Sequence, residues 1–124
     1  MLKTITLVGI GGATGSILRY LASTFIHNKF LSAFPFGTII VNITGCFIIG
    51  VVYALAEKNS ITPEWRFFLA TGICGGYTTF STFSLESFSL LRDGHIFYAS
   101  IYITLSLFLG ILATFIPIFI IEKI

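Results

Sequence analysis

The chain has 124 residues, of which 56% are hydrophobic and only 10% charged, and its formal net charge is +2. A soluble domain carries about 25% charged residues, so a chain with a mean hydropathy of +0.99 cannot cover itself with polar surface and must meet lipid. The small, dispersed positive charge argues against a nucleic-acid partner. Cys46 and Cys74 lie in apolar runs without metal-ligand spacing, which favours buried packing over a disulfide or metal site.

Four segments are apolar and long enough to cross a bilayer as helices, which takes about 20 residues each. They cover residues 4–26, 36–56, 63–91 and 96–121. Polar connections separate them at residues 27–35, at residues 57–64, which overlap the start of the third segment, and at residues 92–95. Thr62 is predicted to cap the third segment, with Pro63 at its first helical position. The sequence therefore predicts an all-α membrane protein that forms one four-helix transmembrane domain.

The middle of the third segment consists of residues that continue a helix poorly. Gly75 and Gly76 are followed by Tyr77, Thr78 and Thr79; glycine and threonine have low helix propensity, and either threonine can cap a new helix. We predict two half-helices with a break between Gly75 and Thr79, the alternative being a continuous helix with a glycine packing face. Bare backbone at membrane depth is tolerated only inside protein or beside a wet cavity, so a break here is expected to be functional.

The positive charges give only a weak orientation signal. The side of the termini carries four of them and the opposite side two: Lys3, Lys58, Arg66 and Lys123 against Lys29 and Arg92. A defined orientation needs a clearer bias. We therefore expect that the chain can insert in both directions and pair with an inverted copy of itself.

Two polar side chains stand inside the first two spans. Arg19 is an intramembrane cation, which marks a functional site by default and favours an anionic substrate, although an arginine this near a helix end can also reach the interface as an anchor. Asn42 shares a helical face with Thr38 and Gly45, and its amide offers two N–H donors without a charge. It suits contact with a partly dehydrated anion and an interhelical hydrogen bond equally well.

The third and fourth spans carry aromatic and polar candidates. Phe80 and Phe83 are three residues apart, and the positive edges of their rings can contact a small anion, although packing is the commoner role in a chain with 14 phenylalanines. Glu86 is expected to accept a hydrogen bond and orient its donor, since a free acid would repel an anion. Tyr102 and Ser106 belong to a semi-polar stripe that either lines a pore or packs against a neighbour.

Glycines in the first span predict close helix packing. Gly11 and Gly15 fit the small-xxx-small pattern of membrane helices. A dinucleotide-binding loop is excluded because Thr14 stands where the last glycine of that motif is required. Since no nucleophile–base pair or cluster of metal ligands is evident, the chain is not expected to be an enzyme.

Three sequence blocks together resemble the Fluc (CrcB) fluoride channel family. They are residues 11–20 (GGATGSILRY), 36–45 (FGTIIVNITG) and 72–83 (GICGGYTTFSTF). The third block, combined with the upstream VNxxG, is highly specific. The resemblance extends over essentially the whole chain in order, length and number of spans.

This resemblance implies an antiparallel, dual-topology homodimer with two fluoride pores and a central structural sodium ion. The residues that match the fluoride path or its vestibule are Phe80, Phe83, Asn42, Arg19, Tyr102 and Ser106. The backbone carbonyls of Gly75 and Thr78 match the sodium ligands. The implied function is passive fluoride export, which gives fluoride resistance, across the cytoplasmic (inner) membrane of a bacterium.

Selective conduction of fluoride requires many weak contacts, because the pore must return most of the hydration energy and still release the ion. Neutral donors suit this task, and we expect them to be the Asn42 amide, the hydroxyls of Thr79, Ser81 and Thr82, and the edges of the two phenylalanine rings. The rival function is a small dual-topology exporter of organic cations. Such an exporter needs a membrane-embedded acid, typically in the first span, where this chain has only Arg19. An accessory membrane subunit, a third possibility, would not explain a broken third helix.

Overall fold

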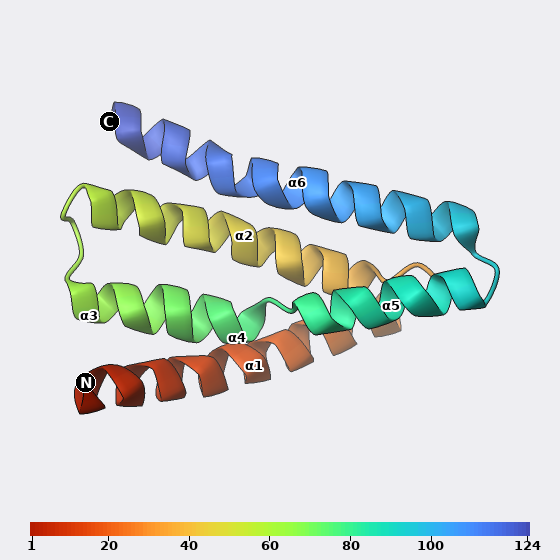
Figure 1. Cartoon of the computed structure of the whole chain (residues 1–124), viewed down its shortest axis with the longest axis horizontal. Helices are drawn as coiled ribbons and strands as arrows, with labels where there is room; N and C mark the ends of the chain where they lie inside the picture. Colours follow the sequence, from red (N-terminus) through yellow and green to blue (C-terminus); the bar gives the residue numbers. More distant parts are fainter.

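Three uninterrupted helices form from the longest apolar runs. The computed structural model describes all residues, Met1–Ile124, and contains only helices and short connections (Figure 1). The three helices that are long and apolar enough to cross a membrane are α1 (Leu2–Phe30), α2 (Phe36–Glu57) and α6 (Ile96–Lys123).

The third pass, residues 63–92, is assembled from four helical pieces. They are α3 (Pro63–Arg66), the π-helical segment η1 (Phe67–Cys74), α4 (Gly75–Tyr77) and α5 (Phe80–Arg92). Thr62 caps α3 as predicted, because its side chain accepts a hydrogen bond from the Trp65 N–H at 3.4 Å. The chain is thus all-helical with four passes, as predicted, and the third of them is interrupted.

One expectation about the connections is wrong. Residues 27–30 were expected to begin a loop, but α1 continues through them to Phe30. His27 and Lys29 lie in the last turn, where positive groups are favoured by the partial negative charge of a helix C-terminus. Leu31 then ends the helix at a φ of 22°, with its N–H donating to the His27 carbonyl at 3.1 Å.

The four passes lie side by side, in the order α6, α2, third pass and α1 in Figure 1. Both termini and the α2–α3 connection lie at one end of the bundle, and the other two connections lie at the opposite end. In sequence-distant contacts, α2 packs chiefly on α6, and α1 packs on η1 and α4. The half of the interrupted pass before the break is therefore held between α1 and α2, whereas α5 packs chiefly on α6.

The contact between α1 and the third pass is so close that only glycine fits. A Cβ on Gly11 would lie 2.6 Å from the Phe68 carbonyl oxygen and 3.0 Å from the Cα of Gly72. A Cβ on Gly15 would overlap the Ile73 carbonyl oxygen. The predicted small-residue packing is confirmed, and it brings the backbone of the third pass directly against α1.

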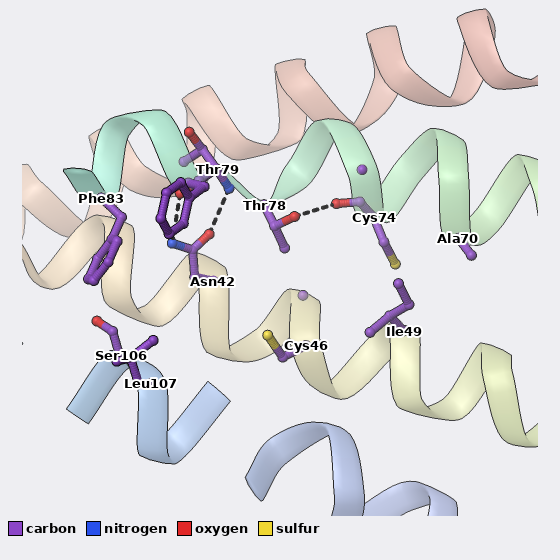
Figure 2. A pocket seen from close by; sticks show the side chains of 13 residues that line it. Asn42, Cys46, Ile49, Ala70, Cys74, Thr78, Thr79, Phe83, Ser106 and Leu107 are labelled. Carbon is purple, nitrogen blue, oxygen red and sulfur yellow. Dashed lines mark hydrogen bonds between the residues drawn. The ribbon is translucent and has the colours of Figure 1, made fainter. Parts of the chain in front are cut away.

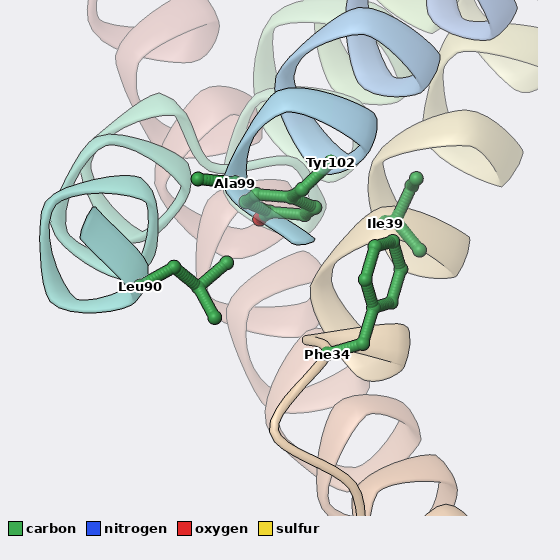
Figure 3. Close-up of a cluster of buried hydrophobic side chains, with 5 residues drawn as sticks. All are labelled: Phe34, Ile39, Leu90, Ala99 and Tyr102. Atoms are coloured by element: carbon green, nitrogen blue, oxygen red, sulfur yellow. The ribbon is translucent and has the colours of Figure 1, made fainter. Parts of the chain in front are cut away.

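A small cluster of buried side chains joins α5 to the other helices at the end opposite the termini. Its members are Phe34, Ile39, Leu90, Ala99 and Tyr102 (Figure 3). They come from α2, α5, α6 and the connection before α2. Only 20 of the 124 residues are buried in the single chain, so its remaining apolar surface must face lipid or another protein.

Candidate functional site

The third pass is interrupted at two threonines. Helix α4 ends at Tyr77, Thr78 and Thr79 take extended conformations with ψ of 157° and 118°, and α5 begins at Phe80. Thr79 caps α5 because its Oγ1 accepts from the Thr82 N–H at 3.1 Å. The predicted break is therefore present, and the continuous-helix alternative is wrong.

Asn42 of α2 is paired with the backbone at the break. Its Oδ1 accepts from the Thr79 N–H at 2.8 Å, and its Nδ2 donates to the Thr79 carbonyl at 3.1 Å (Figure 2). Both backbone groups of Thr79 are thereby satisfied by one side chain. Asn42 thus makes an interhelical hydrogen-bond pair, and one N–H of its amide remains outside that pair.

Arg19 of α1 supports the break from the other side. Its Nε donates to the Gly76 carbonyl at 3.1 Å, and the Ser16 hydroxyl donates to the same oxygen at 3.5 Å. Carbonyls in the last turn of a helix lack intrahelical partners and attract cations. Arg19 is directed toward the interrupted helix rather than toward the membrane surface as an anchor.

Three carbonyls at the break accept no hydrogen bond from the chain, namely those of Gly75, Tyr77 and Thr78. Of these three residues, Gly75 and Thr78 line a pocket at the break, and carbonyl oxygens can replace the water around a monovalent cation. The residues that match sodium ligands therefore fit such an ion, because each offers an oxygen with no competing partner.

The pocket at the break has a volume of about 330 Å³ and is open on one side. Seven of its lining residues were predicted for the site: Asn42, Gly75, Thr78, Thr79, Phe80, Phe83 and Ser106. The rings of Phe80 and Phe83 have centroids 5.7 Å apart, and Phe80 is 77% exposed in the single chain. Ser106 lies next to Phe83 at one end of the pocket, with its hydroxyl oxygen directed toward that ring (Figure 2).

The Ser106 hydroxyl is buried and has no hydrogen-bond partner in the chain. A buried hydroxyl without a partner costs about 1–3 kcal/mol. Its position in the wall of the pocket makes it a free donor for whatever occupies that space.

Tyr102 and Glu86 extend the line of aromatic and polar groups away from the pocket. The Tyr102 ring is 5.2 Å from that of Phe83, and its phenol donates to Glu86 Oε1 at 3.0 Å. Glu86 therefore accepts a hydrogen bond, as expected. It also lines a second pocket of about 210 Å³ at the end opposite the termini, beside His27, Asp93 and His95.

Several predicted residues lie apart from the pocket wall. The hydroxyls of Ser81 and Thr82 contact the Thr79 hydroxyl, at 3.3 and 3.1 Å, and neither residue lines the pocket. Arg19 contacts the break from α1 and is also absent from the wall. Thr79 lines the pocket, but its hydroxyl is already used to cap α5.

Sequence reasoning missed the apolar part of the wall. It consists of Gly45, Cys46, Ile49, Ala70, Cys74 and Leu107. Helical spacing carried the necessary signal, because Asn42, Cys46 and Ile49 follow the i, i+4, i+7 pattern and Ala70, Cys74 and Thr78 are four residues apart. The spacing therefore places Cys46 and Ile49 on the helical face of Asn42, and Ala70 and Cys74 on the face that leads to Thr78.

Comparison with known proteins gives a family match over most of the chain. The profile of the family described as "CrcB-like protein, Camphor Resistance (CrcB)" matches residues 6–118. A "Fluoride-specific ion channel FluC" from Flavobacterium psychrophilum is 47% identical over 114 residues, which is 91% of this chain and 92% of the relative. Proteins with the same name from Phocaeicola vulgatus and Leptospira interrogans are 46% identical over 123 and 110 residues, covering 98% and 88% of this chain and 100% and 87% of the relatives.

Proposed function

The chain belongs to the CrcB-like family, and from this membership and the site at the break we propose that it is a channel that conducts fluoride passively and selectively. The observation that supports this most directly is the line of neutral groups along the pocket. Phe80, Phe83 and Tyr102 follow one another at ring distances of 5.7 and 5.2 Å, with the free hydroxyl of Ser106 beside them. No lysine or arginine stands in the pocket wall to trap an anion.

We propose that fluoride passes along these groups through contacts that are individually weak. Phenylalanine edges carry partial positive charge, and a neutral hydrogen bond contributes about 0.5–1.5 kcal/mol net. The N–H groups of Phe80 and Ser81 at the start of α5 make no bond in the chain and add the positive end of a helix dipole. Arg19 supplies a positive field from behind the break.

We further propose that two copies assemble as an antiparallel homodimer with two pores. The four positive charges at the terminal end are partly offset there by Glu57, Glu64 and Glu122, so the charge difference between the two ends of the bundle is small. The open side of the pocket and the exposed ring of Phe80 suit completion by a partner copy. The assembly would reside in a bacterial cytoplasmic membrane.

A sodium ion held by the carbonyls of Gly75 and Thr78 from both copies is part of this proposal. The free state of both oxygens supports it. The ion would neutralise carbonyl dipoles that meet where the two breaks cross, and so stabilise the dimer.

Export of organic cations fits the structure less well. Glu57, Glu64 and Glu122 lie at the ends of their helices. The acid farther inside a pass is Glu86, which lies on α5 rather than α1 and already accepts a hydrogen bond from Tyr102. The deciding experiment is efflux from liposomes that contain the purified protein, with fluoride and chloride measured in parallel. Fluoride efflux without chloride efflux is expected; equal rates would contradict selectivity, and efflux of ethidium alone would favour the exporter.

A further inference from the structure

The free carbonyls of Gly75 and Thr78 have each lost a hydrogen bond for a specific reason. In a continuous α-helix the carbonyl of residue i accepts from the N–H of residue i+4. The donor for Gly75 would be the Thr79 N–H, which instead donates to Asn42 Oδ1 at 2.8 Å. The donor for Thr78 would be the Thr82 N–H, which instead donates to Thr79 Oγ1 at 3.1 Å. In both places a side chain has taken the N–H that would have closed the helix.

The neighbouring carbonyls do not share this arrangement. The Gly76 oxygen is occupied by Arg19 and Ser16. The Tyr77 oxygen has no partner, but no side chain has captured its donor, the Ser81 N–H, and Tyr77 does not line the pocket. Only for Gly75 and Thr78 do three features coincide: a captured donor, a free oxygen and a place in the pocket wall.

We propose that Asn42 and Thr79 are the positioning residues of the cation site. Their side chains create the site by withholding two N–H groups from the carbonyls of Gly75 and Thr78. This inference rests on the sodium ion of the proposed function and assigns it a cause within this chain. Asn42 acts here through its acceptor oxygen, which its second bond to the Thr79 carbonyl, at 3.1 Å, holds in place.

Substitutions of similar size can remove the hydrogen-bond acceptor or keep it, and so test its role. Asn42→Leu removes the acceptor, whereas Asn42→Asp keeps an oxygen for the Thr79 N–H. Thr79→Val removes the hydroxyl that holds the Thr82 N–H, whereas Thr79→Ser keeps it. In the two variants without an acceptor, the freed N–H groups can return to the carbonyls and close the helix.

The test measures the sodium dependence of dimer stability rather than flux. The purified dimer is heated in detergent at constant ionic strength while sodium is replaced stepwise by N-methyl-D-glucamine, and the fraction of dimer is followed by size exclusion. We expect Asn42→Leu and Thr79→Val to need at least about tenfold more sodium for half of the stabilisation. Asn42→Asp and Thr79→Ser should stay within about threefold of the unmodified protein or need less.

Thr114→Val is the matched control. It removes the hydrogen bond from the Thr114 hydroxyl to the Cys46 carbonyl, at 3.1 Å, which joins α6 to α2 and involves no group of the third pass. Its dimer should lose stability equally at every sodium concentration. If Asn42→Leu yields no dimer, the Thr79→Val and Thr79→Ser pair decides.

An unchanged sodium response in the two variants that lack an acceptor would overturn the inference, and so would a dimer of the unmodified protein that does not respond to sodium. Fluoride efflux by the same preparation keeps the proposed function separate. Efflux without a sodium response removes only the cation site, whereas a sodium response without efflux removes only the channel.

Discussion

At the scale of single residues, the Ser106 hydroxyl stands out because it is the one buried side-chain polar atom without a partner. Several threonine and serine hydroxyls in the passes donate to carbonyls one turn back, as those of Thr14, Ser87 and Ser100 do. Ser106 keeps its donor free beside Phe83 instead. A group that costs stability and lines a pocket is best explained by what passes through the pocket.

Ser106→Ala is expected to separate stability from conduction. The hydroxyl makes no bond in the chain, so its removal should leave dimer stability unchanged or raise it by up to about 1 kcal/mol. Fluoride flux should fall, by roughly twofold to twelvefold, if the lost contact is worth about 0.5–1.5 kcal/mol. Thermal stability and liposome efflux measured on one preparation check both parts. A flux equal to that of the unmodified protein would mean that the hydroxyl is not in the path.

Phe80→Ile and Phe83→Ile test the aromatic part of the path. Isoleucine keeps apolar volume but lacks the positive ring edge. We expect each variant to form a dimer and to conduct fluoride at least about tenfold more slowly, which corresponds to 1.4 kcal/mol. Phe115→Ile is the control, since this exposed ring lies on α6 outside the pocket wall. Normal flux in both variants at the break would show that these rings only pack.

Asn42→Asp tests two roles of this side chain, as an acceptor for the Thr79 N–H and as a neutral group beside the proposed fluoride path. The carboxylate keeps an acceptor for the Thr79 N–H but adds a negative charge beside the pocket and loses the donor to the Thr79 carbonyl. We expect fluoride efflux to fall strongly, by about tenfold or more, while the sodium response of the dimer is retained. A variant that conducts normally would exclude Asn42 from the anion path.

The sequence predicted which residues belong to the site where a polar side chain lies inside an apolar span. It did not predict which groups those side chains would bond to. An arginine and an asparagine inside apolar spans had to find polar partners, but helical spacing does not say which ones. Arg19 and Asn42 both reach the break, over 57 and 37 residues of sequence. That meeting depends on how α1 and α2 pack around the third pass, which is a tertiary property.

At the scale of elements, glycine spacing sets how α1 meets the third pass. Gly9 and Gly11 are two residues apart in one helix, yet a Cβ meets nothing within 4 Å at Gly9 and comes within 2.6 Å of a backbone oxygen at Gly11. Backbone cannot move aside as a flexible side chain can. The face of α1 that carries Gly11 and Gly15, and that contacts Gly72 of η1, is therefore a fixed interface.

This difference predicts opposite effects for two equivalent substitutions. Gly11→Ala should lower the stability of the folded protein by roughly 1–3 kcal/mol through overpacking. Gly9→Ala should leave it unchanged or raise it by up to about 1 kcal/mol through helix propensity. Thermal melts of both variants in one detergent provide the measurement. Equal stability of the two would mean that α1 is not held as closely as the structure shows.

Element boundaries show where sequence reasoning stopped. The break at Thr78 and Thr79 was predictable because glycines and capping hydroxyls coincide there. The π-helical winding of Phe67–Cys74 was not, since nothing in its apolar composition distinguishes it from an α-helix. The polar residues 27–29 predict a loop, but they form the last turn of α1, where basic groups are favoured.

At the scale of the whole molecule, both termini lie at one end of the bundle. The small difference in charge between the two ends therefore predicts that the chain inserts into the membrane in both orientations. Lys29 lies in the last turn of α1, which ends opposite the two termini. On a background with Cys46 and Cys74 replaced by alanine, Lys29→Cys should react with an impermeant reagent from both sides of the membrane, in about equal shares. Lys58→Cys reports the other end and should do the same. Reaction of each cysteine from one side only, and from opposite sides, would establish a single orientation.

The hydrogen bonds that Arg19 and Asn42 make to the break also have a consequence for biogenesis. Arg19 and Asn42 belong to the two helices that are synthesised before the third pass, and chains fold from the N-terminus as they emerge. When the interrupted pass reaches the bilayer, hydrogen-bond partners for its unpaired peptide groups are already in place. The break can therefore insert without exposing those groups to lipid, which would be costly. A permuted gene that encodes α1 after α6 would deliver the break without its arginine, and we expect a lower yield of inserted protein from it.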